Sequence, residues 1–252
     1  MHESIWEFPD EFAAQVREYE LRQACCETLE PVLAASRFTR EDLAGIGVSG
    51  IEFAAFKTMH RSGLSTDLVG MRGRNATTQP GRVYRIDHDG YFIQLDIAKP
   101  LPFESACVEW VYAEHLVEHV QLGVAIDWLT EVRRVLVPGG RLRLTTPDLR
   151  TYVEGYLHDN GFFAEHRRRL HTRSAGSPDM PARKAYILNQ IFYLWGHRWI
   201  YDLDELRYAL TRAGFRESTI TRCTFRRGER ADVAMLDRAS RKHETMYVEA
   251  EA

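Results

Sequence analysis

The sequence predicts an α/β protein built around a mostly parallel β-sheet. The apolar runs 91–95 and 107–112 have the length of short buried strands, and 141–146 is predicted as a third strand. The segment 125–137 lies between the second and third strands and is amphipathic, and the turn Pro138-Gly139-Gly140 ends it. Short strands that alternate with a helix and short loops are typical of parallel α/β units. Ligands of such sheets bind at the carboxyl ends of the strands, where Asp96 and the pair Glu114-His115 lie.

The composition is that of an ordinary globular protein. The 252 residues are 44% hydrophobic and 27% charged, which fits one large domain or one domain with an appendage. The net charge of -3 argues against a nucleic-acid partner. Because no apolar run has the length of a membrane span or of a signal-peptide core, we expect a cytoplasmic protein without a membrane partner. The four cysteines lack C-x-x-C spacing, which fits a reducing compartment.

The segments before the central stretch predict a helical N-terminal region and then strands. The apolar spacing over 10–35 predicts a helix, and Thr39 with Asp42 forms a capping box for a second, short helix. This region is either a packing appendage or a lid over a pocket. Residues 51–56 and 64–69 have the character of strands, and 82–86 with 91–95 predict a hairpin closed by Asp89-Gly90.

The segments after the central stretch predict helices and then an edge hairpin. Pro147-Asp148 begins a helix, residues 182–195 are amphipathic, and Asp202 caps a helix over 203–212. Residues 218–225 and 245–249 alternate like two strands joined by a polar connector, so we expect an antiparallel hairpin at one edge of the sheet.

A literal G-x-G-x-x-G occurs at Gly45-Ile46-Gly47-Val48-Ser49-Gly50. Dinucleotide binding requires a strand before these glycines and a helix after them. Here a polar, helix-like segment precedes the glycines and a strand-like run follows. We therefore interpret the motif as a turn.

Several motifs in a fixed order resemble the class I S-adenosylmethionine (SAM) methyltransferases, and most closely a bacterial group of predicted methyltransferases. They are Leu95-Asp96 with Pro100-Leu101-Pro102-Phe103, the run 113–119, Glu131-x-x-Arg134 with Pro138-Gly139-Gly140, Thr146-Pro147-Asp148, the run 195–202 and Ala213-Gly214-Phe215. The resemblance covers about 51–250. It implies a Rossmann-like, seven-stranded, mostly parallel sheet in the order 3-2-1-4-5-7-6 with helices on both faces. Residues 1–50 would then be the helical appendage, 51–252 the α/β domain, and 151–200 a helical cap over the substrate.

The resemblance also implies roles for individual residues around a SAM cofactor. Asp67 stands where such enzymes hold the two ribose hydroxyls, and Asp96 where they bind the adenine amino group. Glu114 faces the methionine end of the cofactor or the substrate. The family has Gly-x-Gly after strand 1, whereas this chain has Ala54-Ala55-Phe56. Ala54 and Phe56 are therefore expected beside the cofactor, and Phe56 is large enough to fill the space of its methionine or ribose moiety. Asp67 and Asp96 could instead be ordinary turn-forming residues at strand ends.

The run His115-Leu116-Val117-Glu118-His119 is also a literal H-x-x-E-H, the inverted zinc-peptidase motif. On a helix the two histidines would share a face and bind zinc. The motif adjoins a strand end and no third ligand is evident, so we predict no metal and expect Glu118 and His119 to orient the loop after strand 4. His115 and His197 are the candidate general bases, because histidine titrates near neutral pH. His197 could alternatively be a packed member of an aromatic cluster.

Two functions remain open. The first is a SAM-dependent methyltransferase acting on an oxygen or nitrogen of a small molecule, with a role in the biosynthesis of specialised metabolites. Four aromatic residues of the cap would line its substrate pocket: Tyr152, Tyr156, Tyr193 and Trp195. The second is a methyltransferase-fold protein that has lost methyl transfer and acts as a partner subunit or catalyses a different reaction. A homodimer or a heteromeric protein partner is compatible with both.

Overall fold

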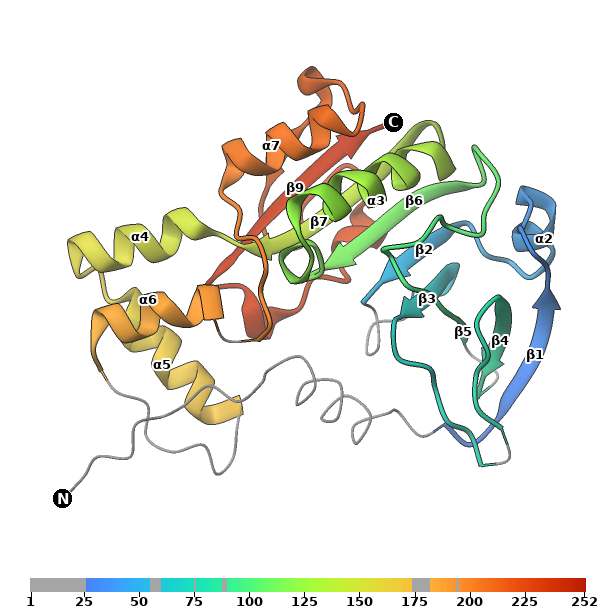
Figure 1. Cartoon of the computed structure of the whole chain (residues 1–252), viewed down its shortest axis with the longest axis horizontal. Helices are drawn as coiled ribbons and strands as arrows, with labels where there is room; N and C mark the ends of the chain where they lie inside the picture. Colours follow the sequence, from blue (N-terminus) through green and yellow to red (C-terminus); the bar gives the residue numbers. More distant parts are fainter. Residues whose placement is uncertain (1–25, 55–59, 75, 88–89, 174–181, 194) are drawn as a thin grey trace.

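A single mixed sheet forms the centre of the computed structural model (Figure 1), which describes residues 26–54, 60–74, 76–87, 90–173, 182–193 and 195–252. Within these residues the strands are β1 (Leu29–Ala34), β2 (Gly50–Phe53), β3 (Gly63–Asp67), β4 (Arg82–Ile86), β5 (Gly90–Gln94), β6 (Val108–Glu114), β7 (Leu136–Pro147), β8 (Thr221–Cys223) and β9 (Thr245–Glu251). The α-helices are α2 (Arg40–Gly45), α3 (Leu122–Val135), α4 (Leu149–His158), α5 (Phe162–Arg173), α6 (Lys184–Tyr193), α7 (Leu203–Arg212) and α8 (Ala231–Ala234). None of the helices described is long and apolar enough to cross a membrane.

The strand order confirms the predicted topology and extends it. The sheet runs β1-β4-β5-β3-β2-β6-β7-β9-β8. When β2, β3, β5, β6, β7, β8 and β9 are counted in chain order, their spatial order is 3-2-1-4-5-7-6. The strands β5, β3, β2, β6 and β7 are parallel to one another, and β9 is antiparallel to β7 and to β8. The strands β1 and β4 are additions at one edge.

The helix predicted over 10–35 is wrong for the residues of β1. Leu29–Ala34 is a strand that pairs antiparallel with β4, with a register shift between Pro31 and Leu33. Proline lacks a backbone donor and is tolerated on edge strands. Pairing with β4 thus overrides the helix-like spacing of the apolar residues. Residues 1–25, which contain the rest of the predicted helix, lie outside the part of the chain that the structure describes.

Two local predictions near the N-terminal half are confirmed. The amide of Asp42 donates to Thr39 Oγ1 at 3.1 Å, and the amide of Thr39 donates to Asp42 Oδ2 at 2.8 Å, so the capping box opens α2. The strands β4 and β5 form the predicted antiparallel hairpin. Asp89, part of the predicted turn, lies outside the described residues.

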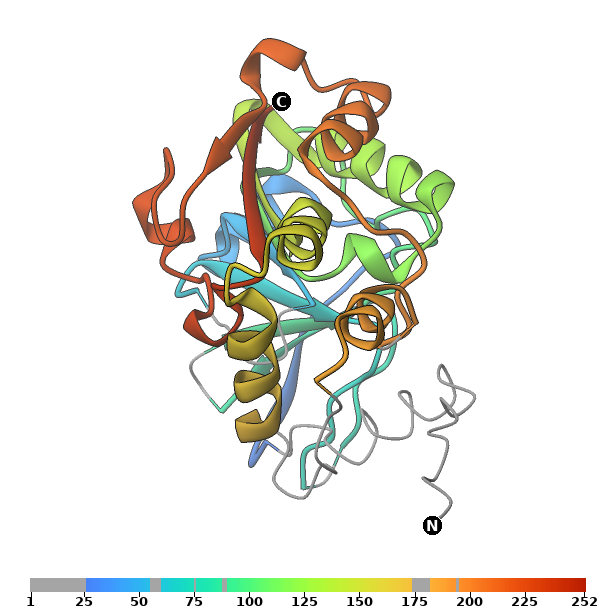
Figure 2. The same cartoon turned by 90° about the vertical axis from the view of Figure 1, so that its left-hand side faces the viewer.

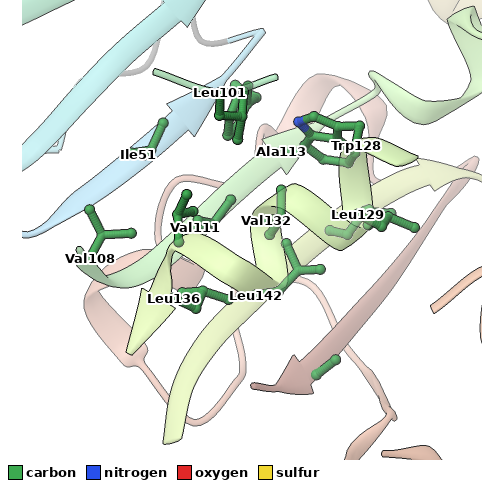
Figure 3. Close-up of a cluster of buried hydrophobic side chains, with 14 of the residues drawn as sticks. Ile51, Leu101, Val108, Val111, Ala113, Trp128, Leu129, Val132, Leu136 and Leu142 are labelled. Carbon is green, nitrogen blue, oxygen red and sulfur yellow. The ribbon is translucent and has the colours of Figure 1, made fainter. Parts of the chain in front are cut away.

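The main hydrophobic core lies between the sheet and the helices α3 and α7. Trp128, Leu129 and Val132 of α3 pack against Val111 and Leu142 of the sheet (Figure 3). The amphipathic stripe of α3 therefore faces the strands, as its sequence predicts. α7 packs beside α3, and the same core extends across β2 and β3.

The segment 226–244 covers the opposite face of the sheet. Trp110 and Tyr112 of β6 are fully buried there against Val233, which belongs to the short helix α8. Helices thus lie on both faces, although the second face carries one turn of helix and irregular chain. This segment is the polar connector between β8 and β9, the two strands of the predicted edge hairpin.

The glycine run 45–50 is a turn at the amino end of β2, as predicted. Gly47 has a φ of 77°, a conformation that favours glycine. Gly50 begins β2 under the indole of Trp110, and a Cβ added there would lie 2.0 Å from Trp110 Cε2. The run therefore lies at the strand end away from the ligand-binding edge.

We expect Gly50→Ala to lower the free energy of unfolding by about 1–3 kcal/mol, the usual cost of forcing extra atoms into a packed interior. Gly45→Ala is the matched control, since a Cβ at Gly45 meets nothing within 4 Å. Urea denaturation of both variants measures the difference. Equal stability of the two variants would contradict the close approach of Trp110.

The helices α4, α5 and α6 form a separate layer beyond the carboxyl ends of β6 and β7 (Figures 1 and 2). They pack together through a small apolar cluster that includes Tyr152, Phe163, Ile187 and Ile191. This layer contains most of 151–200, and its role as a cap over a substrate stays a prediction.

Candidate functional site

Ala54, the residue after β2, has a backbone conformation that usually requires glycine. Ala54 follows β2 directly and has a φ of 53°. Non-glycine residues rarely adopt this left-handed conformation. Ala54 therefore keeps the conformation of the glycine that the sequence comparison leads us to expect. Ala55 and Phe56 lie outside the described residues.

Glu52 is a buried carboxylate that the sequence analysis missed. It lies on β2 with no exposed surface, and its Oε1 accepts a hydrogen bond from the amide of His60. This bond joins β2 to the far end of the turn that Ala54 begins. The sequence offers one signal for such a group, an acidic residue within an apolar strand. A carboxylate buried in this way requires a hydrogen-bond partner.

Asp67 ends β3 at the carboxyl edge of the sheet. Its Oδ1 accepts a hydrogen bond from the amide of Val69 at 3.2 Å. Burial raises the pKa of the Asp67 carboxyl to about 6, against the opposing effect of the Val69 and Leu68 amides. Within the part of the chain described, no Lys, Arg or His forms an ion pair with it. Asp67 is thus a partly buried acid without a cationic partner among the described residues.

Asp96 follows β5 and forms a local turn. Its Oδ1 accepts from the amide of Ala98 at 3.0 Å, and its Oδ2 lies 3.6 Å from Lys99 Nζ. Asp96 therefore forms a turn, and this contact leaves the carboxylate partly exposed at the same edge as Asp67, so that contact with a cofactor stays a prediction. Gln94 Nε2 donates to the carbonyl of Leu68 at 3.0 Å and ties the two loops together.

Glu114 ends β6 and faces the connector 226–244. Its Oε2 lies 2.9 Å from Arg238 Nε, and its Oε1 accepts from the Arg238 amide at 3.1 Å. The carboxylate is buried. Arg238 therefore neutralises Glu114, and the pair anchors the connector to the sheet.

His115 turns the chain away from β6 with a φ of 52°. Its Nε2 lies 2.8 Å from Thr245 Oγ1, and its Nδ1 lies 3.2 Å from Glu118 Oε1. Both ring nitrogens of His115 therefore have a partner. Glu118 is fully buried, and its Oε2 accepts from Thr146 Oγ1 at 3.0 Å.

Glu118 is ionised in spite of its burial. Burial alone would raise the pKa of its carboxyl, but the charge and hydrogen bond of His115, with smaller effects of His119 and His197, hold the pKa at about 2. The prediction that Glu118 orients the loop after β6 is confirmed by these contacts and by its carbonyl. That carbonyl accepts from the amides of Arg198 and Trp199 at 2.6 Å and 3.2 Å.

His119 and His197 lie together next to Glu118. Their ring centroids are 5.0 Å apart at an interplanar angle of 73°. Burial lowers the pKa of His119 to about 4, against the charge of Glu118, and burial also lowers the pKa of His197. Both rings are therefore neutral at pH 7. His197 Nδ1 lies 2.6 Å from the carbonyl oxygen of Ile191, and so carries the hydrogen that this carbonyl accepts.

The H-x-x-E-H run does not form the helix that a zinc peptidase needs. Val117–His119 is one turn of 3₁₀-helix, and His115 lies outside it in a left-handed conformation. His115 and His119 therefore do not share one face of an α-helix. The histidine that joins Glu118 and His119 comes instead from position 197, far along the chain.

The four predicted substrate-pocket residues are not all in one place. Tyr152 is buried, and its hydroxyl donates to Glu244 Oε2 at 2.6 Å, beside His166. Tyr156, Tyr193 and Trp195 are 42%, 59% and 45% exposed. Tyr152 thus belongs to a buried polar cluster with Glu244 and His166. The other three residues lie on the surface of the helical layer.

The comparisons with known proteins agree with this arrangement. Residues 46–144 match a family described as a methyltransferase domain. No protein of curated function matches the sequence significantly.

Several solved structures are similar to the chain. A SAM-dependent methyltransferase from Mesorhizobium loti is 16% identical over 85% of this chain and 98% of its own, with a TM-score of 0.44. A SAM-dependent methyltransferase from Archaeoglobus fulgidus is 10% identical over 95% and 92%, with a TM-score of 0.42. A putative methyltransferase of Haloferax volcanii, in a complex with the Trm112 activator, is 17% identical over 82% and 83%, with a TM-score of 0.43.

These TM-scores are all below 0.5, so the similarity to methyltransferases depends on the family match and on the strand order of the sheet. The match begins just before β2 and ends within β7, so it contains the five parallel strands. The remaining strands β8 and β9 complete the order 3-2-1-4-5-7-6. Residues 46–144 thus match a methyltransferase domain, and the sheet has the strand order that the resemblance to the class I SAM-dependent methyltransferases implies.

Proposed function

We propose that the protein is a SAM-dependent methyltransferase that transfers a methyl group to an oxygen or nitrogen of a small molecule in the cytoplasm. SAM would lie along the carboxyl ends of β2, β3 and β5. The backbone at Ala54 would approach its methionine end, Asp67 would accept from the ribose hydroxyls, and Asp96 would accept from the adenine amino group. These three residues follow three adjacent parallel strands.

Asp67 is the observation that carries this proposal. Removing a carboxylate from water without a cation to pair with it is costly, and such groups concentrate at functional sites. A carboxylate has two oxygens and can accept one hydrogen bond from each ribose hydroxyl. The acid at the end of β3, which has no cationic partner among the described residues, therefore suits a ligand that brings two donors.

The proposal does not depend on a cofactor contact of Glu114 or Phe56. Glu114 is paired with Arg238, so we assign it to the support of the connector, with the cofactor contact left as a prediction from the sequence. Phe56 lies outside the described residues, and its position beside the cofactor also stays a prediction.

The acceptor needs alignment with the methyl carbon more than it needs acid or base help. Of the two candidate bases, His115 has both ring nitrogens engaged. His197 has one nitrogen engaged, by the carbonyl of Ile191, and leaves Nε2 for the acceptor. We therefore favour His197 over His115 as the group that meets the acceptor.

Isothermal titration calorimetry with SAM and with S-adenosylhomocysteine tests the proposal. We expect one site per chain with a dissociation constant in the micromolar range for both ligands. Absence of heat at millimolar ligand would overturn the proposal. It would favour the alternative function, in which methyl transfer has been lost; that alternative also predicts that Phe56→Gly gains the missing binding.

The affinity for SAM should increase with pH between 5 and 7. The ionised form of Asp67 accepts from both ribose hydroxyls, and with a pKa of about 6 in the free protein it is mostly protonated at pH 5 and mostly ionised at pH 7. The expected gain is about tenfold across this range, since the ionised fraction rises by that factor. Asp67→Asn cannot ionise and should flatten the profile. A tenfold gain that persists in Asp67→Asn would contradict the role of Asp67.

A further inference from the structure

A second group of functional side chains lies at the same edge of the sheet, beyond β6. Glu118, His119 and His197 each offer one ligand atom, and these atoms all lie within 4.8 Å of one another. Ligands of a transition metal lie about 2.0–2.2 Å from the ion, so two of them can be at most about 4.4 Å apart. Closure of a few tenths of an ångström would therefore bring the three atoms around one ion.

The backbone holds these three residues together. The carbonyl of Glu118 accepts from the amides of Arg198 and Trp199, which fixes the loop after β6 against the segment that carries His197. The cluster thus does not depend on chance contacts between flexible side chains. It is built by main-chain hydrogen bonds between segments about 80 positions apart in the sequence.

The surrounding contacts resemble the outer shell of a metal site. A metal-binding histidine usually donates its other ring N–H to a carbonyl or carboxylate, which fixes the tautomer and aims the lone pair. His197 Nδ1 donates to the Ile191 carbonyl, so the lone pair of His197 is on Nε2. Thr146 Oγ1 donates to Glu118 and holds that carboxylate in place.

His115 lies beside Glu118 and supports its carboxylate. Thr245 Oγ1 donates its hydrogen to the carbonyl of Arg241, so it acts as an acceptor toward His115 Nε2. His115 therefore has a hydrogen on Nε2, and its Nδ1 faces Glu118 Oε1. This contact supports the Glu118 carboxylate, and His115 is not one of the three ligands.

We propose that Glu118, His119 and His197 bind one divalent transition-metal ion of the Zn²⁺, Mn²⁺ or Fe²⁺ class. Two imidazoles and one carboxylate suit these ions, whereas Mg²⁺ and Ca²⁺ prefer oxygen ligands alone. The site replaces the expectation of no metal, and it gives His197 Nε2 a ligand role in place of a proton-accepting one.

The position of the site indicates what the ion would do. Glu118 is fully buried, whereas His119 and His197 are intermediate in exposure, so an approach to the ion would lie on the imidazole side. β6 lies two strands from β3, which is about 10 Å at the usual strand spacing. The ion would thus lie beside the cofactor edge, where its open positions take oxygen atoms of the methyl acceptor, such as those of a diol or a hydroxy acid. This second step rests on the proposed function.

Calorimetric titration of the metal-free protein with Zn²⁺ and with Mn²⁺, without SAM, tests the site directly. We expect one equivalent to bind, with the affinity for each ion lowered at least about 100-fold in His119→Asn and in His197→Asn, and with millimolar Mg²⁺ failing to compete. His158→Asn, an exposed histidine on α4, is the matched control and should bind like the wild type. Circular dichroism and S-adenosylhomocysteine titration of each variant show whether it is folded.

Three results would overturn the metal site. They are no binding by the folded wild type, unchanged affinity in folded His119→Asn, and loss of the ion in His166→Asn with retention in His119→Asn. The last result would place the ion at the neighbouring group of His166, His243 and Glu244, whose ligand atoms also lie within 4.8 Å of one another.

The open positions have a separate readout. Bound Mn²⁺ should increase the relaxation rate of water protons, because exchanging water occupies positions that the acceptor later takes. Binding without such enhancement would show a closed structural ion and overturn the acceptor role. If the protein binds the metal but not S-adenosylhomocysteine, the metal site is supported and the proposed function is contradicted.

Discussion

Arg143→Ala is expected to lower the free energy of unfolding by about 3–5 kcal/mol, the cost of removing one partner from a buried ion pair. Arg143 is 1% exposed on β7. Its guanidinium donates twice to Asp237, at 2.9 Å and 2.6 Å, and once to Glu249 at 2.7 Å. The carbonyls of Thr224 and Arg227 accept from it at 3.2 Å each. The substitution would leave two carboxylates buried without a cation.

This effect should also reach the connector 226–244. Asp237 lies in that segment and accepts from the amide of Arg226, and Glu249 accepts from the amide of Glu229. Guanidinium denaturation of Arg143→Ala measures the loss. Arg216→Ala removes an exposed pair with Glu251 and should cost at most about 1 kcal/mol. Similar losses in the two variants would contradict the role of Arg143 as the buried anchor of this face.

Asp67→Ala is expected to weaken SAM binding at least about 100-fold. Hydrogen bonds to a charged group each contribute about 1.5–3 kcal/mol, so two bonds to the ribose hydroxyls amount to about 3–6 kcal/mol. A loss of 2.8 kcal/mol or more corresponds to about 100-fold or more in the dissociation constant. The fold should be unaffected or slightly more stable at pH 7, because an unpaired, partly buried charge has been removed.

The comparison with an exposed acid isolates this effect. Asp127 lies on the exposed face of α3, and Asp127→Ala should bind SAM like the wild type. Calorimetry on both variants gives the two dissociation constants. If Asp67→Ala binds SAM within a factor of three of Asp127→Ala, the ribose contact is wrong.

Much of the fold could be predicted because its signals are local. The five parallel strands, the capping box of α2 and the amphipathic face of α3 each follow from spacing within one segment. The motif Glu131-x-x-Arg134 is a case in which the structure supplies the reason. Arg134 donates to the carbonyls of Leu101 and Phe103, and Glu131 accepts from the amide of Leu101, so the motif holds the elbow after β5 against α3.

What could not be predicted depends on contacts between distant segments. β1 resembles a helix in isolation and becomes a strand because β4 offers an unpaired edge. Glu118 is part of a zinc-peptidase motif in the sequence, and only the folded chain brings His197 beside Glu118 and His119, with Arg198 and Trp199 bonded to the Glu118 carbonyl. Arg143 is an ordinary charged residue in sequence, and its carboxylate partners lie about 100 positions away.

The central claim is that the carboxyl ends of β2, β3 and β5 hold SAM. A crystal structure of the complex with S-adenosylhomocysteine tests it most directly. We expect electron density along this edge, with both ribose hydroxyls about 2.5–2.7 Å from the Asp67 carboxylate, the range for charge-assisted O–H···O bonds. Density for the ligand elsewhere, or a ribose that does not contact Asp67, would contradict the account.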